Sequence, residues 1–230
     1  MSESEVREGR LYLKSLSAEG VEHVYLPKAV GASAVAAPLV AGSKKEKLLA
    51  LREQVMTCTL CDELAQKRKN VVFGAGNIGA RLMFVGEAPG RDEDLQGLPF
   101  VGKAGQLLTK IIESIGLTRR EVFICNVLKC RPPDNRAPEP DEILNCSQYL
   151  EKQIDWIQPE IICALGTFAA QTLLKTGTSI SRLRGEAHQY RNIPVVCTYH
   201  PAYLLRNPED KRKVWEDMKK IRSELAKGQS

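Results

Sequence analysis

Four short apolar runs alternate with segments of helical character, and this alternation constrains the fold more than any other feature of the chain. Runs of this length and composition are typical of buried strands. Strands that alternate with helices form a parallel sheet covered by helices on both faces. The predicted strands are residues 81–86, 122–128, 160–165 and 193–198. The sequence therefore predicts an α/β protein, a three-layer α/β/α sandwich with a central four-stranded parallel sheet.

Helical spacing of apolar residues predicts the elements between these strands. The expected helices are residues 44–56, 105–115, 141–157 and 167–174, with Asp141 as the N-cap of the third. Residues 1–43 show no comparable pattern, and their end is rich in small residues. We therefore expect an N-terminal extension or flexible linker over residues 1–43 and one domain over residues 44–226. A docked segment is the alternative for residues 1–43.

The loop after the first predicted strand is rich in residues that bind ligands. It combines Gly90 with the carboxylates Glu87 and Glu93, and Phe100 is its lone aromatic residue. Open α/β sheets place their active sites in loops at the carboxyl ends of strands. Glycine lets the backbone approach a ligand closely, carboxylates hold a water or a developing cation, and a phenyl ring stacks on a flat base. A solvated acidic turn is the alternative.

Two further polar residues lie in or directly after predicted strands. Asn126 lies within 122–128, and its amide offers both a donor and an acceptor, so it could recognise a planar amide edge; alternatively, it caps a neighbouring loop. His200 follows the fourth strand, and we expect its imidazole in a cleft while Leu204 and Arg206 project outward. A lone histidine is more often structural than catalytic.

Four of the seven cysteines lie in polar surroundings, and the other three lie inside apolar runs and are expected to pack in the core. The four are Cys58, Cys61, Cys130 and Cys146. Four such thiolates suit a zinc ion or a [4Fe–4S] cluster, and their spacing does not distinguish the two. A disulfide framework is disfavoured because the cysteine count is odd and no secretory signal is recognised.

A G-x-G-x-x-G pattern at residues 74–79 could suggest a dinucleotide site. That motif must follow a strand and begin a helix. Here it precedes a predicted strand, so we expect a glycine-rich approach to the sheet and no nucleotide cofactor.

Together these motifs resemble the family 4 uracil-DNA glycosylases, the iron–sulfur type. The resemblance covers about 57–220 and rests on GEAPGRDEDLQGLPFVGKAG, the strand with Asn126, HPAYLLR and the four cysteines. It implies the same α/β/α sandwich. It also implies a monofunctional DNA repair glycosylase that flips uracil out of DNA and hydrolyses its N-glycosidic bond. The product would be an abasic site in base excision repair of deaminated cytosine.

The resemblance also implies roles for individual residues. Phe100 would stack on the flipped base, Asn126 would pair with the uracil edge and reject cytosine, and His200 would stabilise negative charge on a uracil carbonyl oxygen. The backbone at Ala88 and Gly90 would contact the base or a phosphate.

Leu204 would wedge into the space left in the duplex, and Arg206 would hold a phosphate. The water is less defined, because Ala88 stands where family 1 enzymes carry an aspartate. Glu87 and Glu93 are equal candidates for positioning it.

A [4Fe–4S] cluster is the cofactor that the resemblance implies, with zinc as the alternative, and we expect it to be structural. A cross-linking relative captures DNA covalently through a histidine, but residues 131–145 contain none, so we expect turnover.

The charge pattern suits a nucleic-acid partner. Lysine and arginine total 33 against 28 acidic residues, and residues 179–230 hold eleven basic and six acidic side chains. A solvated helix face is the alternative. We expect uracil-containing DNA, single- or double-stranded, as the partner. The protein is expected to be a cytoplasmic monomer without a membrane segment. A sliding clamp is left open as a partner of residues 1–43. The rival functions are a DNA-binding module of this fold without glycosylase activity, and an iron–sulfur or zinc enzyme acting on a small nucleoside or an electron carrier.

Overall fold

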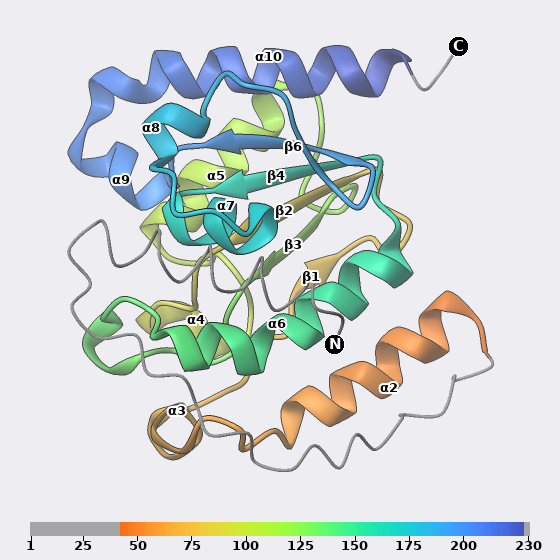
Figure 1. Cartoon of the computed structure of the whole chain (residues 1–230), viewed down its shortest axis with the longest axis vertical. Helices are drawn as coiled ribbons and strands as arrows, with labels where there is room; N and C mark the ends of the chain where they lie inside the picture. Colours follow the sequence, from red (N-terminus) through yellow and green to blue (C-terminus); the bar gives the residue numbers. More distant parts are fainter. Residues whose placement is uncertain (1–41, 228–230) are drawn as a thin grey trace, which may run out of the picture.

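The computed structural model describes residues 42–227, which form a sheet with helices on both faces (Figure 1). The expected linker and clamp contact in the first 41 residues lie outside this range. The strands are β1 (Ala75–Gly76), β2 (Leu82–Gly86), β3 (Phe123–Asn126), β4 (Ile161–Leu165), β5 (His188–Tyr190) and β6 (Ile193–Thr198). Their order across the sheet is β1-β3-β2-β4-β6-β5.

The four predicted strands form the parallel centre of this sheet, but the sheet has six strands because β1 and β5 pair antiparallel at its edges. β5 turns into β6 through Arg191 and Asn192, whose φ angles of 46° and 68° suit a tight hairpin. Strands of two and three residues carry too little pattern to be recognised in a sequence. The prediction of four strands was therefore right for the centre and incomplete at the edges.

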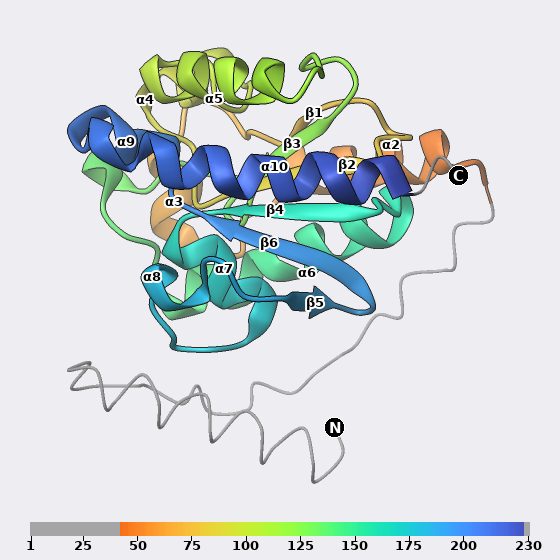
Figure 2. The same cartoon turned by 90° about the horizontal axis from the view of Figure 1, so that it is seen from above.

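Helices cover both faces of the sheet, and Figure 2 shows α5 on one side and α6 and α7 on the other. The helices are α2 (Lys44–Met56), α3 (Asp62–Lys67), α4 (Arg91–Gln96), α5 (Lys103–Ser114), α6 (Pro140–Ile157), α7 (Thr167–Leu174), α8 (Ile180–Leu183), α9 (Pro201–Arg206) and α10 (Lys211–Lys227). Buried side chains of α5, α9 and α10 form one core with the sheet. Those of α2, α6, α7 and α8 form the other. The predicted three-layer sandwich is confirmed.

The predicted helices 44–56 and 167–174 match α2 and α7 residue for residue. The predicted N-cap of α6 was wrong. The helix begins at Pro140, whose fixed φ suits the first helical position. Glu139 is the N-cap and forms a capping box with Glu142. Asp141 lies inside the first turn.

The first two glycines of the G-x-G-x-x-G pattern, Gly74 and Gly76, approach the sheet, as expected. Gly76 belongs to β1, and a Cβ at this position would collide with the carbonyl oxygen of Val122. Its φ of 131° is also one that favours glycine. The three cysteines expected in the core, Cys125, Cys163 and Cys197, are buried. Among the described helices, none combines the length and apolarity needed to cross a bilayer.

Candidate functional site

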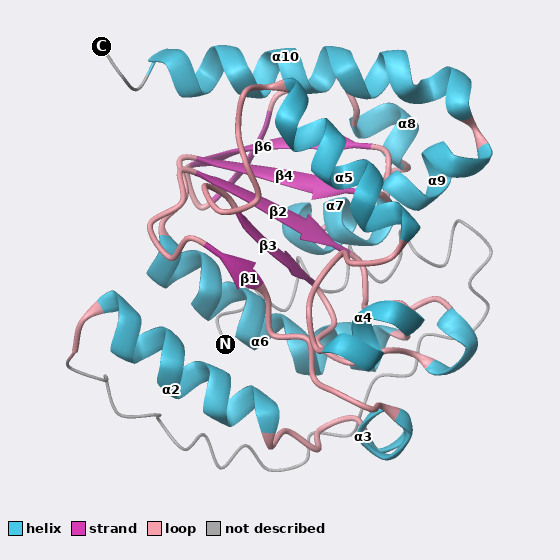
Figure 3. Ribbon diagram, turned by 180° about the vertical axis from the view of Figure 1, so that it is seen from behind, coloured by secondary structure: helices cyan, strands magenta, loops and turns pink. Residues whose placement is uncertain are grey.

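The carboxyl ends of the parallel strands meet at one edge of the sheet, on the side of the molecule that carries α4 and α9 (Figure 3). The register pairs Gly86, the last residue of β2, with Asn126, the last residue of β3. The loop after β2 and the loop after β6 converge there, because the rings of Phe100 and His200 lie 5.5 Å apart between centroids. We call Glu87, Phe100, Asn126 and His200 the strand-end site.

The Asn126 side chain is buried beside Phe100 without a partner for its oxygen. The residue is 1% exposed, and its Oδ1 accepts no hydrogen bond within the described part of the chain. A buried polar atom without a partner costs free energy unless a ligand satisfies it. Asn126 is therefore placed to receive a donor from a bound molecule.

Gly86 makes this arrangement possible, and the sequence interpretation missed it. A Cβ at Gly86 would collide with Asn126 Oδ1 and lie 2.6 Å from Phe100 Cζ. A glycine that ends an apolar strand directly before the ligand-binding loop was the available signal. Any larger residue would push the ring and the amide apart.

Glu93 holds the Phe100 loop in place. Its Oε1 accepts hydrogen bonds from the backbone N–H groups of Val101 at 2.8 Å and Gly102 at 3.0 Å. Phe100 itself has a φ of 53°, which is uncommon for a bulky residue and needs such support. The Phe100 carbonyl group lies against Gly105, at the position that a Cβ of a larger residue would occupy. One oxygen of the Glu93 carboxylate is thus occupied by backbone donors.

Glu87 has a different environment. It is partly buried, and this burial raises the pKa of its carboxyl group. Within residues 42–227 neither an ion pair nor a hydrogen bond holds this carboxylate. Ala88 and Gly90 follow it, and the backbone there leads into α4.

His200 is the N-cap of α9, and its Nδ1 accepts a hydrogen bond from the Ala202 backbone N–H at 3.1 Å. A neutral imidazole with Nδ1 as acceptor carries its proton on Nε2. Burial, with a smaller effect from the charge of Arg206, lowers the pKa of His200 to about 4. The imidazole is therefore neutral near pH 7, with one N–H available to donate.

The expectation that Leu204 projects outward is wrong. Leu204 is 1% exposed and packs in the core between α5, α10 and the sheet. The next side chain on α9 faces solvent instead, since Leu205 is 48% exposed. The predicted exposure of Arg206 is confirmed. Sequence spacing alone could not decide which of two adjacent leucines on a short helix faces the core.

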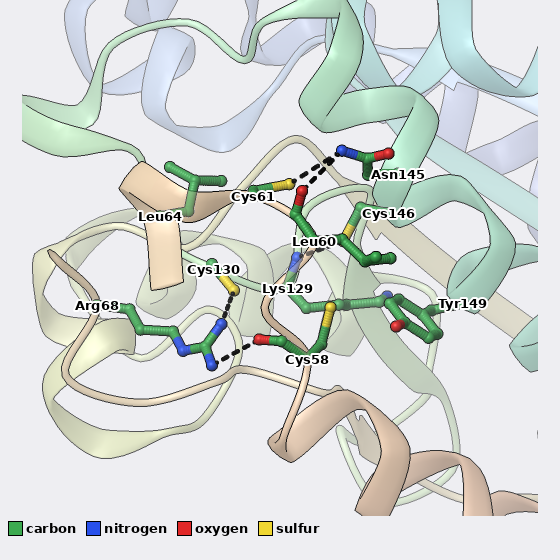
Figure 4. A pocket seen from close by; sticks show the side chains of 10 residues that line it. All are labelled: Cys58, Leu60, Cys61, Leu64, Arg68, Lys129, Cys130, Asn145, Cys146 and Tyr149. Atoms are coloured by element: carbon green, nitrogen blue, oxygen red, sulfur yellow. Dashed lines mark hydrogen bonds between the residues drawn. The ribbon is translucent and has the colours of Figure 1, made fainter. Parts of the chain in front are cut away.

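The four cysteines in polar surroundings gather around one hollow, although they come from segments far apart in the sequence. Figure 4 shows them, and we call this group the cysteine pocket. The residues that line it are Cys58, Leu60, Cys61, Leu64, Arg68, Lys129, Cys130, Asn145, Cys146 and Tyr149. Cys58 and Cys61 precede α3, Cys130 follows β3, and Cys146 lies on α6.

Nitrogen donors point at three of these sulfur atoms. The Arg68 guanidinium lies 3.1 Å from Cys130 Sγ, the Lys129 backbone N–H lies 3.3 Å from Cys146 Sγ, and the Asn145 amide lies 3.7 Å from Cys61 Sγ. Donors of this kind stabilise sulfur that carries negative charge, as metal-bound thiolates do.

Burial raises the pKa of the Cys146 thiol to about 12, so a bound cation would be needed to keep it as a thiolate near pH 7. Within the described residues no group of three or more His, Cys, Asp or Glu donors has the geometry of a single metal ion. The donor set nevertheless fits a thiolate-ligated group.

Comparison with known proteins shows the family of the chain. The model of the uracil DNA glycosylase superfamily matches residues 73–219. The type-4 uracil-DNA glycosylase of Archaeoglobus fulgidus is 46% identical over 184 residues, which cover 76% of this chain and 92% of the relative. The type-4 enzyme of Sulfurisphaera tokodaii is 49% identical over 190 residues, 79% of this chain and 86% of the relative. The type-4 enzyme of Thermotoga maritima is 43% identical over 189 residues, which cover 80% of this chain and 98% of the relative.

The α/β sandwich with a polar site at its strand ends, together with the superfamily model matched over residues 73–219, defines the class of protein. The chain belongs to the uracil-DNA glycosylase superfamily and, within it, to the type-4 uracil-DNA glycosylases. The family expected from the sequence motifs is thus confirmed.

Proposed function

We propose that this protein flips uracil out of DNA and hydrolyses its N-glycosidic bond, leaving an abasic site for base excision repair. The observation that carries the proposal is the buried Asn126 amide beside Phe100 and His200, whose oxygen has no partner among residues 42–227. A duplex hides the glycosidic bond, so the nucleotide must leave the stack before it can react.

Asn126 and Phe100 would select the base. Uracil presents an N–H between two carbonyl groups, and an amide oxygen can accept from that N–H while the amide nitrogen donates to a carbonyl. Cytosine places an exocyclic amine where uracil has a carbonyl, so one donor would face another. Phe100 would stack on the ring, and the backbone at Ala88 and Gly90 would contact the base or a phosphate.

His200 and Glu87 would carry the chemistry. Uracil leaves as an anion while the sugar becomes cation-like. The His200 Nε2–H can donate to a uracil carbonyl oxygen and stabilise the developing charge. We assign the positioning of water to Glu87 in preference to Glu93, because Glu93 Oε1 already binds two backbone N–H groups.

Leu205 and Arg206 would contact the DNA. An exposed leucine at the end of the His200 loop can fill the space that a flipped nucleotide leaves. The geometry favours Leu205 for this role, because Leu204 is committed to the core. Arg206 would bind a phosphate, with further phosphate contacts from the basic side chains of α10.

Cys58, Cys61, Cys130 and Cys146 would hold a [4Fe–4S] cluster. Such a group would cross-link the segment before α3 to β3 and α6, and hydrolysis requires no electron transfer from it. Zinc is the alternative, and iron and acid-labile sulfide analysis of anaerobically purified protein distinguishes the two.

The test is alkaline cleavage of a labelled oligonucleotide with a single uracil after incubation with the protein. Strand cleavage at the uracil is expected, with loss of activity in Asn126→Ala and in His200→Ala. His188→Ala is the matched control, because His188 lies on the edge strand β5 away from the strand-end site. An intact strand, with the metal content at full occupancy, would overturn the proposal in favour of a DNA-binding module.

A further inference from the structure

Lys129 is a buried lysine that touches both the cysteine pocket and the strand-end site. It is 1% exposed. Its ammonium donates to the backbone oxygen of Asn126 at 2.7 Å and to Gln153 Oε1 at 2.6 Å. Its backbone N–H donates to Cys146 Sγ at 3.3 Å, and the residue lines the cysteine pocket in Figure 4. The same residue thus contacts a cluster ligand and the base-reading residue.

The surroundings of this ammonium lack a carboxylate counter-charge. Both of its side-chain partners are neutral oxygens. No acidic side chain lies within ion-pair distance of it in residues 42–227, where ion pairs do form around other lysines, such as Lys213 with Asp210. A buried cation without a partner is strongly destabilising. The four cysteines line the same pocket as Lys129, and as thiolates on a bound metal group they would leave a net negative charge there.

The side chain of Lys129 bonds to Asn126, the residue at which β3 ends. Its bond to the Asn126 carbonyl closes the turn between the strand and Cys130. Gln153, the other partner, also donates to the Phe73 carbonyl at 2.8 Å, so α6 is fastened to the chain that leads into β1. In the described part of the chain, the Asn126 side-chain oxygen accepts no hydrogen bond that could orient it. Its position therefore depends on its backbone, which the pairing with Gly86 and the bond from Lys129 hold.

We propose that Lys129 is a positioning residue that couples the metal-loaded cysteine pocket to uracil recognition: the negative charge of the pocket stabilises the buried ammonium, and the ammonium fixes Asn126. The link from Lys129 to uracil recognition rests on the proposed function. The link between the pocket and Lys129 concerns charge alone and can be measured without DNA.

Lys129→Met tests both links, because methionine keeps much of the apolar stem and removes the charge and the donor. Lys45→Met is the matched control, since Lys45 is exposed on α2. The readouts are iron content, the midpoint reduction potential of the bound group, and single-turnover excision at saturating uracil-DNA. Loss of a nearby cation should shift the potential to a more negative value. Excision should fall about tenfold while DNA affinity stays within about twofold, because Asn126 loses its support but phosphate contacts remain.

Gln153→Glu is the second variant and guards against a Lys129→Met protein that fails to fold. It keeps Lys129 and adds a carboxylate at its existing partner, so the potential should again become more negative. The control should change neither quantity.

Shifts in both potential and excision, absent from Lys45→Met, would support the coupling. An unchanged potential in both Lys129→Met and Gln153→Glu, with full iron content, would overturn the charge link. A shifted potential with unchanged excision would overturn the link to Asn126. If the unaltered protein releases no uracil, the proposed function fails, and the charge link stands or falls on the potential alone.

Discussion

The strand-end site and the cysteine pocket satisfy their polar groups in opposite ways. In the cysteine pocket, nitrogen donors already point at the sulfur atoms of Cys61, Cys130 and Cys146. In the strand-end site, the Asn126 oxygen has no partner in the described structure. The donors that face the sulfur atoms thus have partners within the described protein, whereas the Asn126 oxygen is available to a bound ligand.

This difference predicts that substitutions in the cysteine pocket mainly affect stability, whereas substitutions in the strand-end site mainly affect activity. Removing a group from the cysteine pocket should destabilise the fold, because its neighbours lose partners that they have in the folded state. Removing an unpartnered group from the strand-end site should leave stability unchanged or improved and remove activity, a trade-off that is common at functional sites.

The largest effect is expected from Cys130→Ala. Loss of one of the four proposed ligands should release the proposed metal group, and binding of a structural metal is itself folding free energy, worth about 10 kcal/mol or more in zinc peptides. The segment from Cys130 to Cys146 should loosen. Thermal unfolding and hydrogen exchange of that segment measure this. Cys163→Ala is the control for removing a buried thiol outside the pocket, and a normal melting temperature in Cys130→Ala would contradict the structural role.

Asn126→Leu should have the opposite profile. A near-isosteric apolar side chain removes the unpartnered oxygen, so the free energy of unfolding should stay the same or rise. Excision should fall about 100- to 1,000-fold, the usual cost of removing a group that recognises the reacting part of a substrate. Calorimetry beside single-turnover kinetics measures the two quantities. A clearly lowered stability would mean that Asn126 is structural.

The adjacent leucines of α9 sharpen the comparison further. Leu204→Ala should lower the free energy of unfolding by about 2–5 kcal/mol, because it opens a cavity in the core. Leu205→Ala should change stability by less than about 0.5 kcal/mol and should slow excision from duplex DNA more than from single-stranded DNA, where no space needs filling. Equal effects of Leu205→Ala on both substrates would exclude it as the wedge.

The smallest expected effect is a difference in the pH dependence of excision, which distinguishes the roles of Glu87 and Glu93. Glu87 must be ionised to position a water, and burial raises its pKa, so excision should fall as the pH drops towards that raised value. Burial lowers the pKa of His200 to about 4, so His200 should become protonated at a lower pH than Glu87. Glu87→Gln should slow excision about tenfold or more and flatten the acid side of the profile.

Glu93→Gln provides the contrast. It should keep the acid decline and lower stability instead, because the amide weakens the bonds to Val101 and Gly102. An acid decline that persists in Glu87→Gln and vanishes in Glu93→Gln would reverse the assignment.

Much of the fold was predictable because it depends on local periodicity. The central strands, α2 and α7 each carry an apolar pattern long enough to define one period. The failures have local causes as well. β1 and β5 are too short to show a period, and the N-cap of α6 was decided by Pro140 and Glu139.

The site was predictable in its members but not in their relations. The sequence placed Glu87, Phe100, Asn126 and His200 after or within strands, and parallel strands bring such residues to one edge. It also singled out four cysteines by their polar surroundings. It could not show that Glu93 supports the Phe100 loop, because that bond depends on how the backbone turns between α4 and α5.

By itself, then, the sequence determined the α/β layering, the family and the set of residues with the chemistry to act, because these follow from short-range patterns and motifs. Only the tertiary structure decided which of the two leucines faces solvent, which carboxylate remains free, and that Lys129 joins the cysteine pocket to Asn126. Those relations depend on contacts between segments far apart in the chain, and no local pattern encodes the distance or direction of such a contact.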